Sequence, residues 1–266
     1  MKTASTNGDF LRLLQGQGIT PLEAPSIQGL PAHNPAGSVH GTTVVAAKFR
    51  GGVLNISDRR ATANNVILYD EADKVMALDD YTLVSIAGAY ASAIEAVRFL
   101  KHSFRYYARS QLQELSLEGK LAEVSRVLGQ SLAGALQGIG GFIPIISAFD
   151  RKAGAGRIFF YDIMGARFET REFGAAGSGS VQIKGALEYV VREKGPFHQM
   201  SLKKALKEMF VLLDIAASLD AATGGLAGLL PVAKVVTADG VAQVEEKLLA
   251  DAYEAALGTR TPPGGA

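Results

Sequence analysis

The sequence predicts an α+β protein in which two antiparallel sheets lie between two layers of helices. Strand-like runs and helix pairs follow one another in the order strands, two helices, strands, two helices, strands. The strand runs are rich in Val and Ile, whereas the helical segments repeat apolar residues every three or four positions. Helix pairs between runs of antiparallel strands favour stacked layers over βαβ alternation, so we expect one four-layer αββα sandwich.

The first half of the chain contains four strand candidates and two helices. The first two strands are joined by a tight turn at Gly51-Gly52. Ser116 is a suitable N-cap for the second helix. The expected strands are 43–49, 53–57, 66–68 and 83–87, and the expected helices are 94–112 and 121–135.

The second half repeats this pattern. Gly195-Pro196 ends its first helix, Ser201 begins its second, and Asp239-Gly240 is a hairpin turn between the last two strands. The expected strands are 142–149, 158–163, 166–170, 232–238 and 241–245, and the expected helices are 180–194 and a segment that starts at 201.

The chain is expected to divide into three parts. Residues 1–41 are dense in Gly and Pro, which favours irregular chain, and we interpret them as a segment removed on maturation. Residues 42–250 form the folded domain. Residues 251–266 are expected to be a tail with a disordered end, because its last residues are Thr, Pro, Gly and Ala.

Composition excludes several classes of function. The 266 residues include 27 Lys+Arg and 26 Asp+Glu, a net charge of +1 that argues against a nucleic-acid partner. The absence of Cys excludes thiol nucleophiles and Cys-ligated metals. The most apolar stretch, 139–149, is too short and too interrupted to span a membrane. The four His lack metal-site spacing, and no phosphate-binding loop or G-x-S-x-G motif occurs. We therefore expect a cytoplasmic protein without metal, cofactor or membrane partner.

One junction could supply a catalytic nucleophile. It lies at Gly41-Thr42, where the Gly/Pro-rich segment meets the first expected strand. A Thr hydroxyl is a weak nucleophile unless a base accepts its proton. Cleavage after Gly41 would give Thr42 a free α-amine with a pKa near ~7.7–8, close to its own hydroxyl. A hairpin would bring Asp58 beside the start of the first strand, and Lys74 near Asp58 would favour deprotonation of Thr42.

These residues resemble the catalytic β-type subunits of the proteasome core particle, which are N-terminal nucleophile hydrolases. The match extends from Thr42 to about Glu246, and Asp58, Lys74 and Gly88 follow Thr42 by 16, 32 and 46 residues, as in that family. The matching blocks are Gly41-Thr42-Thr43-Val44-Val45-Ala46, Gly52-Val53-Leu54, Ser57-Asp58-Arg59-Arg60-Ala61-Thr62, Asp73-Lys74-Val75, Ile86-Ala87-Gly88, Ala176-Gly177-Ser178-Gly179-Ser180 and Asp220-Ala221-Ala222-Thr223-Gly224-Gly225.

The resemblance implies a threonine endopeptidase that acts through an acyl-enzyme on Thr42, freed by autocatalytic loss of residues 1–41. Asp58 and Lys74 would tune this nucleophile, and the Gly88 N–H would bind the oxyanion. Three side chains would orient the Thr42 amine, namely those of Ser178, Asp220 and Thr223. Thr223 is at a position where the family often has Ser. Arg60 would be structural, and Thr62 and Gly88 would pair with the substrate backbone.

The same resemblance locates a pocket for the substrate side chain that precedes the cleaved bond. Tyr90 stands where the family usually has a small residue. The pocket is still apolar, so we expect cleavage after hydrophobic residues, with the alternative that Tyr90 narrows the pocket and favours small ones. The lining residues are Ala61, Met76, Ile86, Tyr90 and Ile94.

The implied partners are those of the family. They are a homo-heptameric ring of this chain stacked on rings of α-type proteasome subunits, an ATPase unfoldase ring and unfolded protein substrates. The chain looks most like a bacterial or archaeal β-type subunit. An HslV-type peptidase remains an alternative, as do a non-catalytic ring-forming scaffold and an amidase on small molecules. The complete set of active-site residues disfavours the scaffold, and the Asp58-Arg59-Arg60-Ala61-Thr62 and Ser178-Gly179-Ser180 blocks disfavour the amidase.

Overall fold

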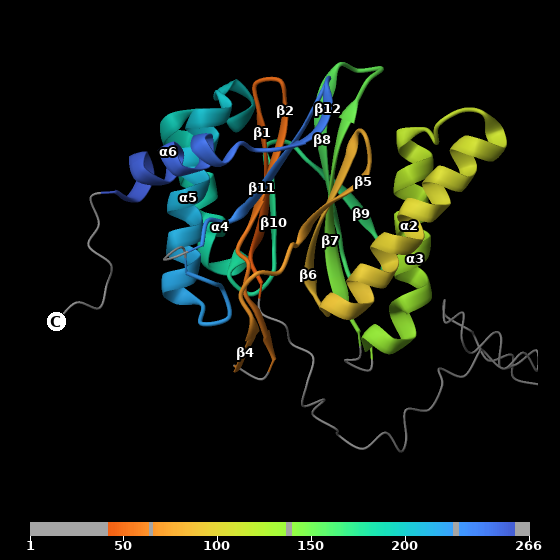
Figure 1. The fold of residues 1–266 in the computed structure, drawn as a ribbon, viewed down its shortest axis with the longest axis horizontal. Helices are drawn as coiled ribbons and strands as arrows, with labels where there is room; N and C mark the ends of the chain where they lie inside the picture. The colour runs from red at the N-terminus through yellow and green to blue at the C-terminus, as the bar shows by residue number, and fades with distance from the viewer. Residues whose placement is uncertain (1–41, 64–65, 137–139, 226–228, 259–266) are drawn as a thin grey trace, which may run out of the picture. The chain divides into compact units, whose positions relative to one another are not determined.

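The computed structural model describes residues 42–63, 66–136, 140–225 and 229–258. The expected pro-segment, 1–41, the cleavage position Gly41 and the end of the expected tail, 259–266, lie outside these described residues. Within them the chain forms an α+β sandwich of two antiparallel sheets between helices, as the sequence predicts (Figure 1).

The first sheet has the strand order β10-β1-β2-β11-β12. Its centre is the hairpin of β1 and β2, in which Val44 pairs with Ser57, and β11 pairs with the other edge of β2. The bounds are β1 (Val44–Phe49), β2 (Gly52–Ser57), β10 (Phe173–Ala176), β11 (Val232–Thr237) and β12 (Gly240–Gln243).

The second sheet has the order β5-β6-β7-β8-β9, and a separate two-stranded hairpin follows β2. All pairings of the second sheet are antiparallel. Its strands are β5 (Val75–Asp79), β6 (Thr82–Gly88), β7 (Phe142–Asp150), β8 (Ala155–Tyr161) and β9 (Arg167–Thr170); the hairpin is β3 (Ala61–Ala63) and β4 (Val66–Tyr69).

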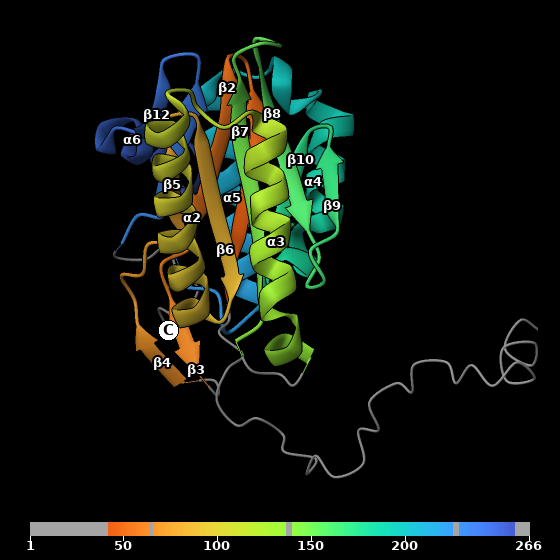
Figure 2. The ribbon, with the colours of Figure 1, turned by 90° about the vertical axis from the view of Figure 1, so that its right-hand side faces the viewer.

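Helices cover the outer face of each sheet. The long helices α2 (Tyr90–Gln111) and α3 (Leu117–Leu136) cover the second sheet (Figure 2). On the other side lie α4 (Ser180–Lys194), α5 (Leu202–Leu219) and α6 (Glu246–Leu257), with the short 3₁₀ helix η1 (Phe197–Gln199) between α4 and α5 (Figure 1). No helix within the described residues combines the length and the apolar character needed to cross a lipid bilayer.

Three apolar cores separate the four layers, because alternate residues of each strand point to opposite faces of its sheet. On β2, Leu54 and Ile56 pack under α4, α5 and α6, whereas Val53 packs between the two sheets. On β6, Val84 and Ile86 pack under α2 and α3. Strands that are apolar on both faces are thus the physical cause of the sandwich.

Most expected elements are confirmed, with boundaries that move by a few residues. The Ser201 hydroxyl caps α5 by accepting the backbone N–H of Lys204, and the Ser116 hydroxyl accepts that of Gly119 at the start of α3. The sequence reasoning missed β3, β5, β10 and α6. β10 lies in a glycine-rich stretch and is extended because it pairs with β1, where Val44 lies opposite Ala176.

The expected domain boundary at residue 250 needs correction, because it falls inside α6. Leu249, Ala252 and Leu257 are buried in the core that α6 shares with α5, and the rings of Phe210 and Tyr253 meet edge to face at 5.7 Å. Residues 251–257 therefore belong to the packed domain.

Candidate active site

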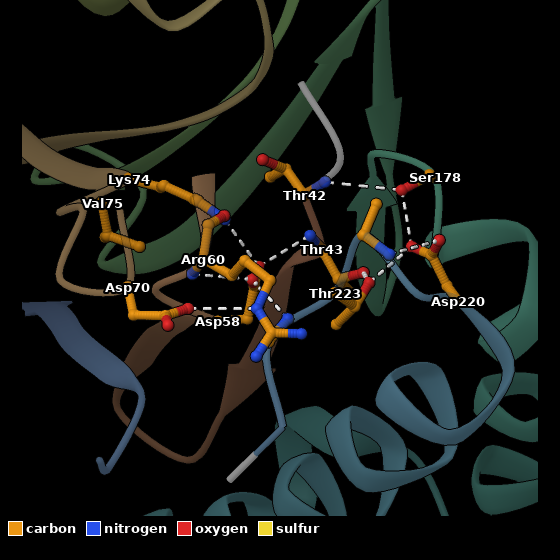
Figure 3. Close-up of polar contacts among 12 residues, drawn as sticks. Thr42, Thr43, Asp58, Arg60, Asp70, Lys74, Val75, Ser178, Asp220 and Thr223 are labelled. Atoms are coloured by element: carbon orange, nitrogen blue, oxygen red, sulfur yellow. Dashed lines mark hydrogen bonds and ion pairs between the residues drawn. The ribbon is translucent and has the colours of Figure 1, made fainter. Parts of the chain in front are cut away.

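Thr42 lies two residues before Val44, the first residue of β1. It is 4 % exposed, and its backbone nitrogen donates to Ser178 Oγ at 3.4 Å. Figure 3 shows Thr42 between Lys74 on one side and Ser178 on the other. The chain therefore brings the expected nucleophile next to two of its expected partners, which lie 32 and 136 residues away in the sequence.

The β1–β2 hairpin brings Asp58 to Thr43. Because Val44 pairs with Ser57, the next residue of each strand continues the register: the Asp58 N–H donates to the Thr43 carbonyl at 3.2 Å, and the Thr43 N–H donates to Asp58 Oδ1 at 2.8 Å. Lys74, immediately before β5, reaches across from the second sheet, and its Nζ is 2.8 Å from Asp58 Oδ1. Asp58 and Lys74 are each 1 % exposed. The expected ion pair is thus present and buried.

The Asp58 carboxylate lies in a cage of donors. Besides Thr43 and Lys74 on Oδ1, its Oδ2 accepts the backbone N–H groups of Arg60 at 3.0 Å and Gly224 at 2.9 Å. Lys74 also donates to the Arg60 carbonyl. Burial lowers the pKa of the Lys74 ammonium, and the attraction of Asp58 offsets only part of this effect. A lysine with a lowered pKa beside a buried Thr is an arrangement found at catalytic sites.

A second network lies on the other side of Thr42. Asp220 Oδ2 accepts hydrogen bonds from the hydroxyls of Ser178 and Thr223, each at 2.6 Å. The hydroxyls of Thr223 and Thr43 are 2.7 Å apart. A Cβ on Gly179 would lie 2.1 Å from Thr43 Oγ1, so this position has room only for glycine. The three residues expected to orient the Thr42 amine are therefore brought together.

Arg60 occupies the loop between Asp58 and the β3–β4 hairpin. Its backbone contacts both members of the buried ion pair, as described above. Its guanidinium points away from Thr42, and its Nε donates to Asp70 Oδ1 at 3.0 Å (Figure 3). The structural role expected for Arg60 stays a prediction.

Gly88 and Thr62, the residues expected to bind the substrate backbone, lie on β6 and β3. Gly88 has φ +109°, and a Cβ there would lie 2.6 Å from the Gly141 carbonyl oxygen, so only glycine fits. Thr62 is 2 % exposed. Their contacts to a substrate stay a prediction.

Four of the five expected pocket residues come together where β5, β6 and α2 meet. Met76, Tyr90 and Ile94 pack against the core that contains the buried Ile86, whereas Ala61 lies on the separate β3 strand. The Tyr90 hydroxyl donates to the Asp73 carbonyl at 3.2 Å. Burial, with the charge of Asp73 adding to it, raises the pKa of the Tyr90 phenol, so the hydroxyl stays protonated.

Groups of three further residues contact the site but were not singled out for it from the sequence. They are the Thr43 hydroxyl and N–H, the Gly224 N–H and the Asp70 carboxylate. Alternation along β1 indicates that Thr43 points away from Thr42, but not which residue it meets. The Gly224 contact joins residues 166 positions apart and carries no local signal.

Comparisons with known proteins identify the family of the chain. The family model for proteasome subunits matches residues 38–229. The chain belongs to the proteasome subunit family. It is 36 % identical over 224 residues to proteasome subunit beta 2 of Thermomonospora curvata, a match that covers 83 % of this chain and 78 % of the relative. It is 35 % identical over 257 residues to proteasome subunit beta of Acidothermus cellulolyticus, covering 92 % of this chain and 87 % of the relative.

The similarity of this proteasome-family chain to its relatives is therefore to bacterial β subunits, over nearly the whole described domain. The resemblance on which the expected site residues depend is confirmed at the level of the family. The family places the chain in a proteasome core peptidase.

Proposed function

We propose that this chain is a threonine endopeptidase of the proteasome core, with the hydroxyl of Thr42 as its nucleophile. The observation that carries the proposal is the position of Thr42, buried between the Lys74–Asp58 ion pair and Ser178. Autocatalytic cleavage after Gly41 would free the Thr42 amine. The similar bacterial proteins are named as proteasome β subunits, which supports a proteolytic role.

The free amine would act as general base. Its pKa of ~7.7–8.0 suits proton transfer near neutral pH. Thr42 Oγ attacks the substrate carbonyl carbon while its proton passes to the amine. The C–N bond of the tetrahedral intermediate then breaks, and the proton passes to the leaving amine. Water hydrolyses the resulting ester of Thr42, which restores the hydroxyl.

Two groups of the site would stabilise charge in these steps. The Lys74 ammonium, held by Asp58, favours a negatively charged Thr42 oxygen. The Gly88 N–H would donate to the oxyanion, a contact worth ~3–4 kcal/mol in the barrier of other enzymes. The Ser178–Asp220 hydrogen bond would hold the Ser178 hydroxyl against the amine.

Met76, Ile86, Tyr90 and Ile94, which pack together, would line the specificity pocket with Ala61 at its edge, and their apolar character supports cleavage after hydrophobic residues. Tyr90 is the residue that could instead restrict the pocket to small side chains. A peptide panel that varies the residue before the cleaved bond distinguishes the two, and a preference for acidic or basic residues would contradict an apolar pocket.

The proposed assembly follows the family. We propose a heptameric ring of this chain stacked with α-type subunits and served by an ATPase ring that supplies unfolded proteins, in the cytoplasm. Sedimentation and electron microscopy of the chain co-expressed with an α-type subunit would test the ring, and a particle without sevenfold symmetry would contradict it.

Intact mass and peptide hydrolysis of the assembled protein test the catalytic proposal. We expect the wild type to lose residues 1–41 and to cleave a fluorogenic peptide. Thr42→Ala should keep its full length and be inactive, whereas Thr42→Ser, which keeps the hydroxyl, should retain both reactions. If the assembled wild type stays full-length and cleaves nothing, the chain is a ring-forming scaffold instead.

A further inference from the structure

Lys234 is a charged residue on an otherwise apolar strand face. On β11, Val232 and Val236 face the second sheet, and Ala233 and Val235 face α5. Alternation therefore points Lys234 into the space between the sheets, where its side chain is 16 % exposed. A charge in such a place is costly unless it is paired, so its partners define what it does.

The partners of Lys234 are the two residues on either side of Lys74. Its Nζ donates to Asp73 Oδ2 at 2.7 Å and to the Val75 carbonyl oxygen at 2.5 Å. The Asp73 Oδ1 also accepts the Val75 N–H at 3.0 Å, and the Asp73 carbonyl accepts the Tyr90 hydroxyl. One ammonium group thus holds the side chain of the residue before Lys74 and the backbone of the residue after it.

This contact crosses between the same two sheets as the Lys74–Asp58 ion pair. Lys74 extends from the start of β5 in the second sheet to Asp58, which follows β2 in the first sheet. Lys234 extends in the opposite direction, from β11 of the first sheet to Asp73. β11 is the direct neighbour of β2, and Val232 pairs with Ser57. Lys234 therefore fixes the distance between the two sheets that the Lys74 side chain must span to reach Asp58.

We propose that Lys234 is a positioning residue for Lys74. It holds the segment 73–75 so that the Lys74 ammonium stays on Asp58 and beside Thr42. This role rests on the proposed function, because it matters only if Lys74 acts on Thr42. It extends the set of residues required for activity to one that touches neither the substrate nor the nucleophile.

The experiment compares the full chain, assembled as for the peptidase assay, with three variants and a matched control. Lys234→Met keeps the length of the side chain without its charge, Lys234→Arg keeps the charge, and Asp73→Asn removes the partner's charge. The control is Lys120→Met, which breaks a pair with Asp79 at the other end of β5; Lys120 Nζ is 2.8 Å from Asp79, and its side chain is 10 % exposed.

We expect Lys234→Met to lower kcat on a fluorogenic peptide by ~10- to 100-fold with KM nearly unchanged, since small displacements of catalytic groups reduce rates by such factors. Lys234→Arg should recover most of the lost kcat, and Asp73→Asn should lower kcat as Lys234→Met does. Lys120→Met should leave kcat within about twofold of wild type, because its ion pair lies outside the site.

Three outcomes would overturn the positioning role. They are a wild-type kcat in Lys234→Met, an equal loss in Lys120→Met, and a change in KM rather than kcat. If Lys234→Met does not assemble, Asp73→Asn decides, and a wild-type kcat there overturns the role. Failure of the proposed function is distinguishable, because the wild type would then hydrolyse peptide no faster than Thr42→Ala, and the positioning role would fall with it.

Discussion

The buried ion pair predicts that its two partners are unequally important for stability. In Asp58→Asn, the Lys74 ammonium would be buried without a negative charge beside it. The new amide group would also point its own N–H bonds at two donors, whichever way it is turned. In Lys74→Met, the Asp58 carboxylate would keep three backbone N–H donors, those of Thr43, Arg60 and Gly224.

The magnitudes follow from these contacts. Removing one partner of a buried ion pair typically costs ~3–5 kcal/mol in the free energy of unfolding. We expect Asp58→Asn at the upper end of this range. We expect Lys74→Met to be ~1–2 kcal/mol less severe, because each hydrogen bond to a charged group is worth ~1.5–3 kcal/mol and three of them remain. Both variants should lose ~10²-fold or more in kcat, as for loss of a group that assists proton transfer.

Urea denaturation of the precursor measures the stability difference. All variants are made in a Thr42→Ala background, so that no chain is processed and every sample has the same length. Peptide hydrolysis is measured separately, with Thr42 intact. If Lys74→Met is destabilised as much as Asp58→Asn, the three backbone donors do not stabilise the Asp58 carboxylate in the absence of Lys74.

Three further predictions concern the same site. Burial lowers the pKa of Lys74 below 10.5, so at pH values between the lowered pKa and 10.5 the unfolded chain binds more protons than the folded chain. In urea titrations, the stability of the unprocessed chain relative to its Lys74→Met variant should therefore rise with pH across this window. A fall would contradict a lowered pKa of Lys74. Gly88→Ala should lose ~1–2 kcal/mol of stability because of the positive φ at this position. It should also lose most of kcat, because the added Cβ would displace the Gly141 carbonyl. A stable, fully active variant would show that this position tolerates a side chain. Tyr90→Ala should open the pocket. The ratio of kcat/KM for peptides with a bulky residue before the cleaved bond to kcat/KM for peptides with a small residue there should rise by about tenfold. Tyr90→Phe is the control, and an unchanged ratio in Tyr90→Ala would place Tyr90 outside the pocket.

Local signals in the sequence predict some of the strands and helices but not others. The strands β1 and β2 and the helix α4 follow from runs of β-branched and other apolar residues, from turn residues and from Gly195, which are local signals. β10 and α6 do not. The first is glycine-rich and extended only because β1 is its neighbour, and the second is held by the burial of Leu249, Ala252 and Leu257 in the core that it shares with α5.

The sequence by itself determined the layered α+β fold class, the junction at Thr42 and the spacing of Asp58, Lys74 and Gly88, because these depend on residue type and position along the chain. It also sufficed to indicate the family, since the matching blocks are local.

Only the tertiary structure decided which groups meet across the sheets. The Gly224 N–H on Asp58 joins residues 166 positions apart, and the Lys234 ammonium on Asp73 joins residues 161 positions apart. Alternation assigns a residue to one face of a strand but not to a neighbour on the opposing sheet. That neighbour depends on strand order and on the packing of the two sheets, which long-range burial determines.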